Sequence, residues 1–259
     1  MFGDGGPTGA HAGGQQQQTD GLAHEDSLID EHLITGAGGG QVLALALRAP
    51  HSAASTLVAQ LDAIAGTGID GDRHADPLSP RQVLLASAAV YADLALPAHT
   101  LGENLLVDLD TAQLASGTVL QIGDAVRLRL MFQCEACGHL DAFQAGVSGR
   151  IGRRRGVLAR VLAGGIVRPG DRIRDLGRIL PAWDDDWRAR VAQVLRALPD
   201  GMVLSYAQLA RLAGVQSSYC RAFPRLVKGL GYAGKAVPAQ AAVGLRCWQG
   251  EGLFDDDAG

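Results

Sequence analysis

The feature that most constrains the fold is a succession of short apolar segments, separated by glycine-containing turns, between residues 41 and 171. Segments of this kind are typical of β-strands in a sandwich or barrel. Residues 41–48 (QVLALALR) predict a buried first strand. Residues 125–132 (AVRLRLMF) predict a later one, and the Gly-Asp pair at 123–124 is a strong hairpin signal before it.

Helical segments are scarce in this half of the chain. A short helix over residues 86–94 is the one expected. Residues 166–171 predict the last strand, and the chain then trails off over residues 174–180. The pattern therefore predicts a β-barrel-like domain over residues 41–178.

Residues 185–250 have a different, helical pattern. Apolar residues recur at helical spacing in the segment 187–198, and Pro-Asp-Gly at 199–201 ends it. Acidic residues before Trp187 suit a helix N-terminus. Ser205 predicts the cap of a second helix, which Gly214 ends.

A third helix is expected over residues 218–230, where Pro224 should remove a hydrogen bond and kink it. Two helices joined by a short turn in a basic context indicate a helix-turn-helix, so the fold class is α+β with two domains. Residues 187–250 contain one acid, Asp200, and nine basic residues, which predicts a polyanionic partner. The basic residues are Arg188, Arg190, Arg196, Arg211, Arg221, Arg225, Lys228, Lys235 and Arg246.

Residues 1–40 contain six acids, no Lys or Arg and a run of four glutamines, and lack apolar periodicity. Such a segment buries too little surface to offset its ordering entropy, so we expect a disordered tail. No apolar run is long enough to span a membrane, and no signal peptide is recognised. Four cysteines in 259 residues do not make a disulfide scaffold, so free thiols in a cytoplasmic location are expected.

Two of the four cysteines, Cys134 and Cys137, directly follow the strand predicted over residues 125–132. A thiol near arginines can exist partly as thiolate, as a sulfur carrier, a nucleophile or a metal ligand requires. Half of a zinc site, a redox dithiol and inert buried thiols are the alternatives. A second cysteine pair at suitable spacing is missing, so zinc is not expected. A redox dithiol would stand at the start of a helix, whereas here a strand precedes the motif and a polar, glycine-containing stretch follows it.

Five short sequence motifs indicate a known family. They are GDRH at 71–74, RQVL at 81–84, GENL at 102–105, CEAC at 134–137 and RRGV at 154–157, continued by VRPGD at 167–171. Together they resemble the MOSC family, the domain found at the C-terminus of molybdenum-cofactor sulfurases and also as stand-alone bacterial proteins. The resemblance implies a β-rich fold with a barrel core.

The same resemblance implies a role for one cysteine. The family's cysteine corresponds to Cys137, which would bear a persulfide or ligate molybdenum, and Ala136 replaces a proline that is frequent there. A sulfur donor or a redox partner is then expected. Arginines suit the phosphate of a molybdenum cofactor. The expected cofactor-binding residues are Arg73, His74, Arg81, Glu103, Asn104, Cys134, Arg154 and Arg155.

The helical half resembles a second family. The words LPDGMVLSYAQLA at 198–210, AGV at 213–215 and YCRAFPRL at 219–226 are similar to the DNA-binding domain of O6-alkylguanine-DNA alkyltransferases and alkyltransferase-like proteins. The resemblance implies a winged helix-turn-helix that binds duplex DNA. Tyr206 would contact a phosphate, and Arg221 would fill the gap left by a flipped base.

The active-site motif of that family, Pro-Cys-His-Arg-Val, is replaced here by PAQAAV at 238–243. Ala239 stands where the acceptor cysteine would be, so alkyl transfer is not expected. DNA binding without repair is the function implied, with phosphate contacts that make it salt-dependent. The DNA-binding residues expected are Tyr206, Arg221, Arg225 and Lys228. An alternative is a DNA-binding or damage-recognition protein in which the barrel is a scaffold without activity.

Overall fold

A closed β-barrel forms the first part of the structure. The computed structural model describes residue 1, residues 39–52 and residues 54–255, so the expected N-terminal tail lies almost wholly outside the described residues. Within the described residues, seven strands close in the order β11-β7-β8-β9-β5-β6-β1, with β11 also pairing with β1. They are β1 (Gly40–Leu47), β5 (Val83–Ser87), β6 (Leu105–Val107), β7 (Thr118–Ile122), β8 (Val126–Gln133), β9 (Val157–Ala163) and β11 (Arg172–Arg178).

The strands pair antiparallel around the barrel except at one joint, where β5 and β6 run parallel. The barrel confirms the expected β-rich architecture, and the hairpin between β7 and β8 turns at Gly123 as predicted. The strand β2 (Thr56–Val58) adds to β1 at the rim. A small sheet contains β3 (Leu61–Ile64), β4 (Gly68–Ile69) and β10 (Gly165–Val167).

The prediction for the closing strand is wrong. Part of residues 166–171 belongs to β10 in the small sheet, and the barrel is closed by β11, where the chain was expected to trail off. The reason is that Ile173 is the one fully buried residue of β11. A strand held mainly by backbone pairing, with one buried side chain, has no apolar pattern to reveal it.

The strand β8 contains a bulge near its end. Leu130 pairs with Ala159 and Phe132 pairs with Leu158, so Met131 is an extra residue between two consecutive pairs. Residues two apart in a regular strand face the same side. Here Leu130 packs in the barrel core, whereas Phe132 packs with the C-terminal helices. The bulge therefore turns the end of β8, and the cysteine segment after it, toward a different neighbour.

Short helices cover one end of the barrel. They are α1 (Ala88–Leu94), α2 (Val147–Ile151) and the 3-10 turns η2 (Gly138–Ala142) and η3 (Gly152–Arg155). Leu94, Leu140 and Val147 belong to the small apolar cluster that holds them together. No helix in the described part of the chain is long and apolar enough to cross a membrane.

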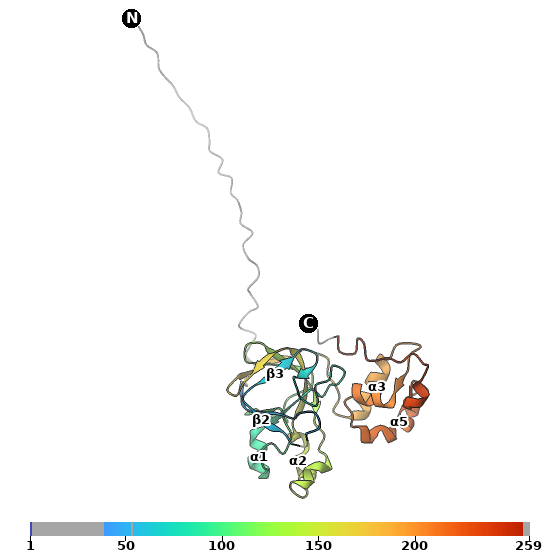
Figure 1. Ribbon diagram of the computed structural model, residues 1–259, viewed down its shortest axis with the longest axis horizontal. Coiled ribbons are helices and arrows are strands. Elements are labelled where there is room, and N and C mark those ends of the chain that lie inside the picture. Colours follow the sequence, from blue (N-terminus) through green and yellow to red (C-terminus); the bar gives the residue numbers. More distant parts are fainter. Residues whose placement is uncertain (2–38, 53, 256–259) are drawn as a thin grey trace. The chain divides into compact units, whose positions relative to one another are not determined.

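The C-terminal segment, coloured orange to red in Figure 1, is helical as expected. Asp186 and Ser205 cap α3 and α4 through their side chains, which confirms both predicted caps. The elements are α3 (Trp187–Ala197), β12 (Leu204–Ser205), α4 (Tyr206–Leu212), η4 (Ser217–Ala222), α5 (Phe223–Gly229), β13 (Ala236–Val237) and η5 (Ala239–Ala242).

The third helix differs from its prediction. The expected continuous helix is a 3-10 turn, η4, followed by α5, and Pro224 is the second residue of α5. A proline in the first turn interrupts no helical hydrogen bond, because the N–H it lacks has no partner within the helix. Pro224 therefore begins a helix, and the expected kink is absent.

The C-terminal helices share one apolar core with the barrel. Phe132 and Leu158 of the barrel pack with Val194 and Leu209 of the helices. The contact is tightest at Gly214, which follows α4 with φ +61°. A methyl group at Gly214 would lie 2.6 Å from Pro80 Cγ and 2.7 Å from Phe132 Cζ.

We expect Gly214→Ala to lower the free energy of unfolding by about 2–4 kcal/mol, because backbone strain adds to a steric clash. Gly201→Ala is the matched control, because Gly201 has φ +73° and nothing within 4 Å of an added methyl group. The control should cost about 1 kcal/mol, from backbone strain alone. Denaturant unfolding of both variants measures the difference, and equal losses would mean that the helices do not pack tightly on Phe132.

Candidate functional site

A pocket of about 70 Å³ lies where β8 ends and the cysteine segment begins. Cys134 is buried in its wall, 6% exposed. The wall contains guanidinium groups, one imidazole, one amide and one thiol, and no carboxylate side chain. Its residues are Arg48, His74, Arg81, Leu84, Leu101, Gly102, Asn104, Cys134, Arg155 and Leu158.

Arg48, which the sequence analysis did not single out, follows β1 and reaches this pocket. Its guanidinium group occupies the space beside Gly102, where any side chain would collide with it. Gly102 has φ +67°, a conformation that glycine adopts without strain. Burial lowers the pKa of Arg48, and the nearby cations Arg73 and Arg155 lower it further. The charge on Arg48 is therefore held in an environment that favours an added anion.

Arg155 is a further cation of the wall. Its Nε and Nη1 atoms are buried and have no hydrogen-bond partner in the described part of the structure. An unpaired buried donor costs about 1–3 kcal/mol. A bound anion that accepts hydrogen bonds from Arg155 would remove this cost.

The frame of the pocket is a hydrogen-bonded pair of buried side chains, Asp72 and Asn104. Asp72 accepts hydrogen bonds from the backbone N–H of Arg48 and of His74, at 3.0 and 2.8 Å. Asn104 donates to Asp72 and accepts from the N–H of Leu84, at 3.0 and 3.1 Å. Asn104 therefore holds β1, β5 and the turn at Asp72 together. It also lines the pocket, and its contact with a cofactor stays a prediction.

His74 and Arg73 occupy different places, although they are adjacent in the predicted motif. His74 lines the pocket, while the Arg73 side chain is exposed and donates to the carbonyl of Ser52 at 3.5 Å. Enclosure of the imidazole lowers the pKa of His74 and the neighbouring arginines lower it further, while Asp72 acts in the opposite direction. His74 is thus favoured in its neutral form, which can donate one hydrogen bond.

Several other predicted site residues do not line this pocket. Glu103 is buried and accepts a hydrogen bond from the Tyr91 hydroxyl at 2.6 Å, which together with burial raises the pKa of Tyr91. Arg154 faces Asp93 at 3.7 Å. Cys137 is half-buried and immediately precedes η2, outside the wall that contains Cys134. In the described residues, no three His, Cys, Asp or Glu side chains are grouped as metal ligands.

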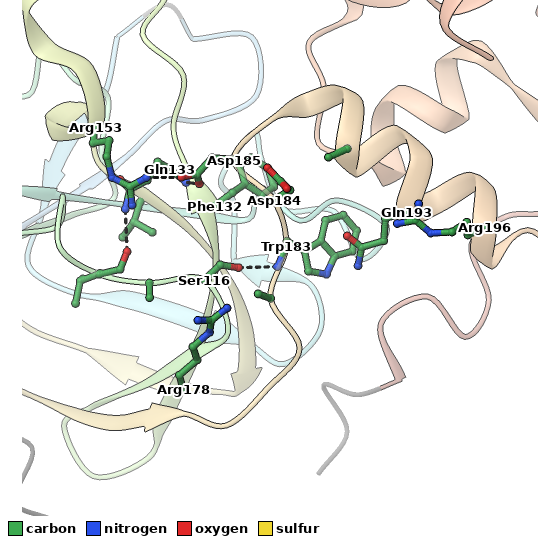
Figure 2. Close-up of a pocket in the computed structure, with 15 residues that line it drawn as sticks. Ser116, Phe132, Gln133, Arg153, Arg178, Trp183, Asp184, Asp185, Gln193 and Arg196 are labelled. Atoms are coloured by element: carbon green, nitrogen blue, oxygen red, sulfur yellow. Dashed lines mark hydrogen bonds and ion pairs between the residues drawn. The ribbon is translucent and has the colours of Figure 1, made fainter. Parts of the chain in front are cut away.

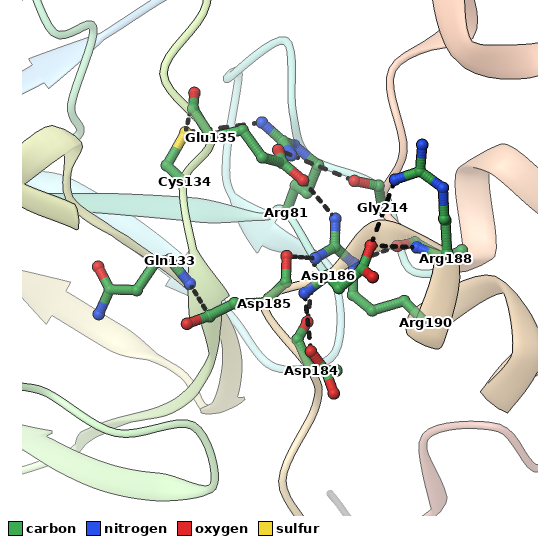
Figure 3. Close-up of polar contacts among 11 residues, drawn as sticks. Arg81, Gln133, Cys134, Glu135, Asp184, Asp185, Asp186, Arg188, Arg190 and Gly214 are labelled. Carbon is green, nitrogen blue, oxygen red and sulfur yellow. Dashed lines mark hydrogen bonds and ion pairs between the residues drawn. The ribbon is translucent and has the colours of Figure 1, made fainter. Parts of the chain in front are cut away.

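A polar network connects the cysteine segment to the C-terminal helices (Figure 3). Arg81 contacts the Cys134 Sγ atom at 3.7 Å, Glu135 at 3.0 Å and the carbonyl of Gly214 at 3.1 Å. Arg190 of α3, fully buried, donates to the other carboxylate oxygen of Glu135 at 2.5 Å. Its guanidinium group also lies 3.6 Å from the centre of the Phe132 ring. Glu135 is thus held by one arginine from the barrel and one from the helices.

A larger cavity of about 640 Å³ lies near the start of α3 (Figure 2). Arg153 reaches it and forms an ion pair with Asp185, while Arg178 of β11 and Arg196 of α3 line it from other directions. No cysteine lines this cavity. The three consecutive arginines at 153–155 therefore lie in three different surroundings. Of the three, Arg155 lines the pocket that contains Cys134.

The basic residues of the C-terminal segment fall into two groups. Arg190 is buried, and Arg211 forms a bidentate ion pair with Asp76 of the barrel at 2.6 Å, so neither is available to a polyanion. Arg221, Arg225 and Lys228 are exposed on η4 and α5. A hollow of about 630 Å³ lies beside them, lined by Trp187, Arg188, Arg221, Ala222, Arg225, Leu226, Gly229 and Leu230.

Tyr206 is half-buried, and its ring lies edge-on to Phe223 with the centroids 6.1 Å apart. Cys220 is partly buried, and burial raises the pKa of its thiol. A raised pKa leaves less thiolate, so Cys220 has little of the reactivity of an alkyl acceptor. Ala239 begins η5, in the place expected from the sequence for the acceptor cysteine.

Comparison with known families gives a match to part of the chain. The model of the MOSC domain matches residues 71–174. The match covers less than half of the chain and supports a MOSC domain over these residues. The domain family is associated with molybdenum cofactor binding or sulfur transfer. The matched residues of this MOSC domain include Arg81, Cys134, Cys137 and Arg155, whereas Arg48 lies before them. Residues 185–250 lie outside the match, so their resemblance to alkyltransferase domains stays a prediction.

No curated protein matches the chain. Three solved structures are similar in backbone. The YuaD protein from Bacillus subtilis has 20% identity and a TM-score of 0.48, over 52% of this chain and 94% of its own. YiiM from Escherichia coli has 20% identity and a TM-score of 0.43, over 73% of this chain and 92% of its own. YiiM from Geobacillus stearothermophilus has 15% identity and a TM-score of 0.44, over 73% and 99%.

We expect Glu135→Gln to lower the free energy of unfolding by about 2–3 kcal/mol, because it leaves the buried Arg190 without its anion. Arg211→Gln also removes an ion pair between the barrel and the helices, but this pair is exposed and should cost about 0–1 kcal/mol. Denaturant unfolding of the two variants provides the comparison. If Arg211→Gln were the more destabilising change, the buried network would not be the main polar connection.

Proposed function

We propose that the MOSC domain binds a small, multiply charged anionic group in the arginine pocket, and that a thiol of the segment 134–137 carries sulfur or ligates molybdenum beside it. The observation that supports this most is the composition of the wall, where Arg48, Arg81 and Arg155 meet the Cys134 thiol and no carboxylate lines the pocket. Glu135, which pairs with Arg81, lies outside the wall. Guanidinium groups bind phosphate-like oxyanions through paired hydrogen bonds.

The residues of the pocket suit part of a molybdenum cofactor. The arginines suit its phosphate, and a thiolate is the soft ligand that molybdenum favours. The pocket of about 70 Å³ is much smaller than the roughly 300 Å³ or more of sites that enclose a drug-sized ligand. The arginines Arg48, Arg81 and Arg155 would therefore hold the phosphate of the cofactor. Cys134 or Cys137 would offer a thiolate to the molybdenum.

When bound, such a cofactor would supply the redox or sulfur chemistry of molybdenum. The chain's own residues have simpler roles. Arg81 stabilises the negative charge of a Cys134 thiolate, because the two groups are in contact. His74 and Arg155 offer hydrogen-bond donors to an anion, and Asp72 with Asn104 holds the loops that carry them.

We expect protein purified under reducing conditions to contain either stoichiometric molybdenum or the added mass of one sulfur atom. Elemental analysis and intact mass measure the two. The double variant Cys134→Ser/Cys137→Ser should lose this cargo, because it removes both candidate thiols. Cys220→Ser/Cys247→Ser is the matched control and should retain it. The proposal would be contradicted if wild-type protein contained neither molybdenum nor an added sulfur atom and also bound no oxyanion.

We propose a second function for residues 185–250, which is binding of duplex DNA without repair. The supporting observation is the exposed set Arg221, Arg225 and Lys228, which lies on the segment that corresponds to the recognition helix of the resembled family. Tyr206 would contact phosphate and Arg221 would enter the helix stack. Ala239 excludes alkyl transfer to that position, so recognition is the remaining role.

For DNA binding, we expect Arg221→Ala to weaken affinity for duplex DNA about tenfold and to reduce the slope of log K against log salt by about 1. Arg174→Ala, an exposed arginine on β11, is the control with the same change of charge. Fluorescence anisotropy at several salt concentrations, with plain and O6-methylguanine duplexes, gives both numbers. Equal effects of the two substitutions would mean that binding follows net charge alone, and would refute a specific role of Arg221.

A further inference from the structure

The size and lining of the arginine pocket narrow the class of its ligand. A volume of about 70 Å³ holds a few water molecules or one small polyatomic ion, since a water needs about 10–15 Å³ of such space. Three arginines and a histidine surround it, from three separate segments of the chain. A planar monovalent carboxylate is satisfied by one guanidinium group. Donors arriving from several directions fit a tetrahedral dianion better.

The thiol in the wall adds a chemical requirement. Cys134 Sγ contacts Arg81 Nη2, which also lines the pocket, so the same guanidinium group can stabilise a thiolate and touch the anion. Phosphate and sulfate have the right shape and charge but offer no group that a thiolate can take. Thiosulfate has the same tetrahedral shape and double charge, and contains one transferable sulfur atom.

We infer that the pocket receives a sulfane-sulfur oxyanion of the thiosulfate type, and that Cys134 is the thiol that takes its outer sulfur. The inference rests on the proposed function and specifies its sulfur donor. The Cys134 thiolate attacks the outer sulfur, and a bond forms between it and Sγ. The bond from the outer sulfur to the sulfonate sulfur breaks, and sulfite leaves with that electron pair. The product is a Cys134 persulfide, and no other oxidant or reductant is required.

Each arginine has a separate part in this step. Arg155, whose buried Nε and Nη1 atoms lack partners in the described structure, binds the sulfonate oxygens. Arg48 fills the space beside Gly102 and adds a second donor group from the opposite loop. Arg81, in contact with the thiol, lowers the cost of forming the thiolate. Sulfite carries the same charge as thiosulfate, so the cations continue to stabilise the leaving group.

The test uses the full chain, reduced and then freed of reductant. Thiosulfate is added, released sulfite is assayed, and peptide mapping locates the added sulfur. Wild-type protein should release about one sulfite per chain and carry the sulfur on Cys134. Cys134→Ser and Cys134→Ala should release none, while their circular dichroism shows that they fold. Cys220→Ser, which removes a thiol elsewhere, should behave as wild type.

The anion site is tested separately from the thiol. Arg155→Gln should raise the half-saturating thiosulfate concentration about tenfold, since a charge-assisted hydrogen bond is lost. Arg178→Gln, on the exposed side of β11, is the matched control and should not change it. Inorganic phosphate and sulfate should compete with thiosulfate.

Three results would overturn the inference. They are sulfur found on Cys137 but not Cys134, equal effects of Arg155→Gln and Arg178→Gln, and phosphate binding without sulfite release. The last result would leave the proposed anion-binding function intact, because it fits the phosphate of a cofactor. Absence of any oxyanion binding would refute both.

Discussion

The extra residue in β8 is the constraint on which the site depends. Met131 interrupts the alternation of the strand, so Leu130 stays in the barrel core while Phe132 faces the C-terminal helices. Ser116 fixes this bulge: its hydroxyl donates to the carbonyl of Met131 and accepts from the N–H of Trp183. A regular strand would place Phe132 inside the barrel, and would aim the following thiol elsewhere.

The buried arginine on α3 depends on the same bulge. Arg190 covers Phe132 and donates to Glu135 and to the backbone carbonyls of Asp184, Asp185 and Ala213. These partners offset the cost of removing a guanidinium group from water. Since Glu135 also binds Arg81, which touches Cys134, the helices and the pocket share a continuous set of hydrogen bonds.

The structural elements that were predicted correctly are those that depend on short-range sequence patterns. The caps Asp186 and Ser205, the hairpin at Gly123 and the strand before Cys134 all follow from short-range signals, and the structure confirms them. Of the residues that the family motifs predict to bind a cofactor, five line one pocket: His74, Arg81, Asn104, Cys134 and Arg155. Arg48 was missed because it lies outside every motif and reaches the pocket through the pairing of β1 with β6, which no local pattern reveals.

The other misses have similar physical origins. The sequence did not separate Glu103, which bonds to Tyr91 away from the pocket, from Asn104, which lines it, because buried and pocket-facing polar residues look alike in a motif. The strand β11 was missed for lack of apolar residues, and Pro224 was misjudged because the start of α5 was placed too early. The extra residue in β8 left no signal, since VRLRLMFQ reads equally well as a regular strand.

The number of strands in the barrel has a consequence for the pocket. Each antiparallel pairing reverses the strand direction, and after one full circuit of a closed barrel the direction must be the same as at the start. The number of antiparallel joints must therefore be even. Seven strands make seven joints, and at least one must therefore be parallel; here it is the joint between β5 and β6. Parallel neighbours need a long crossover instead of a tight turn. The crossover after β5 contains α1 and then places Leu101, Gly102 and Asn104 in the pocket wall. Part of the site therefore lies on the crossover that an odd number of strands requires.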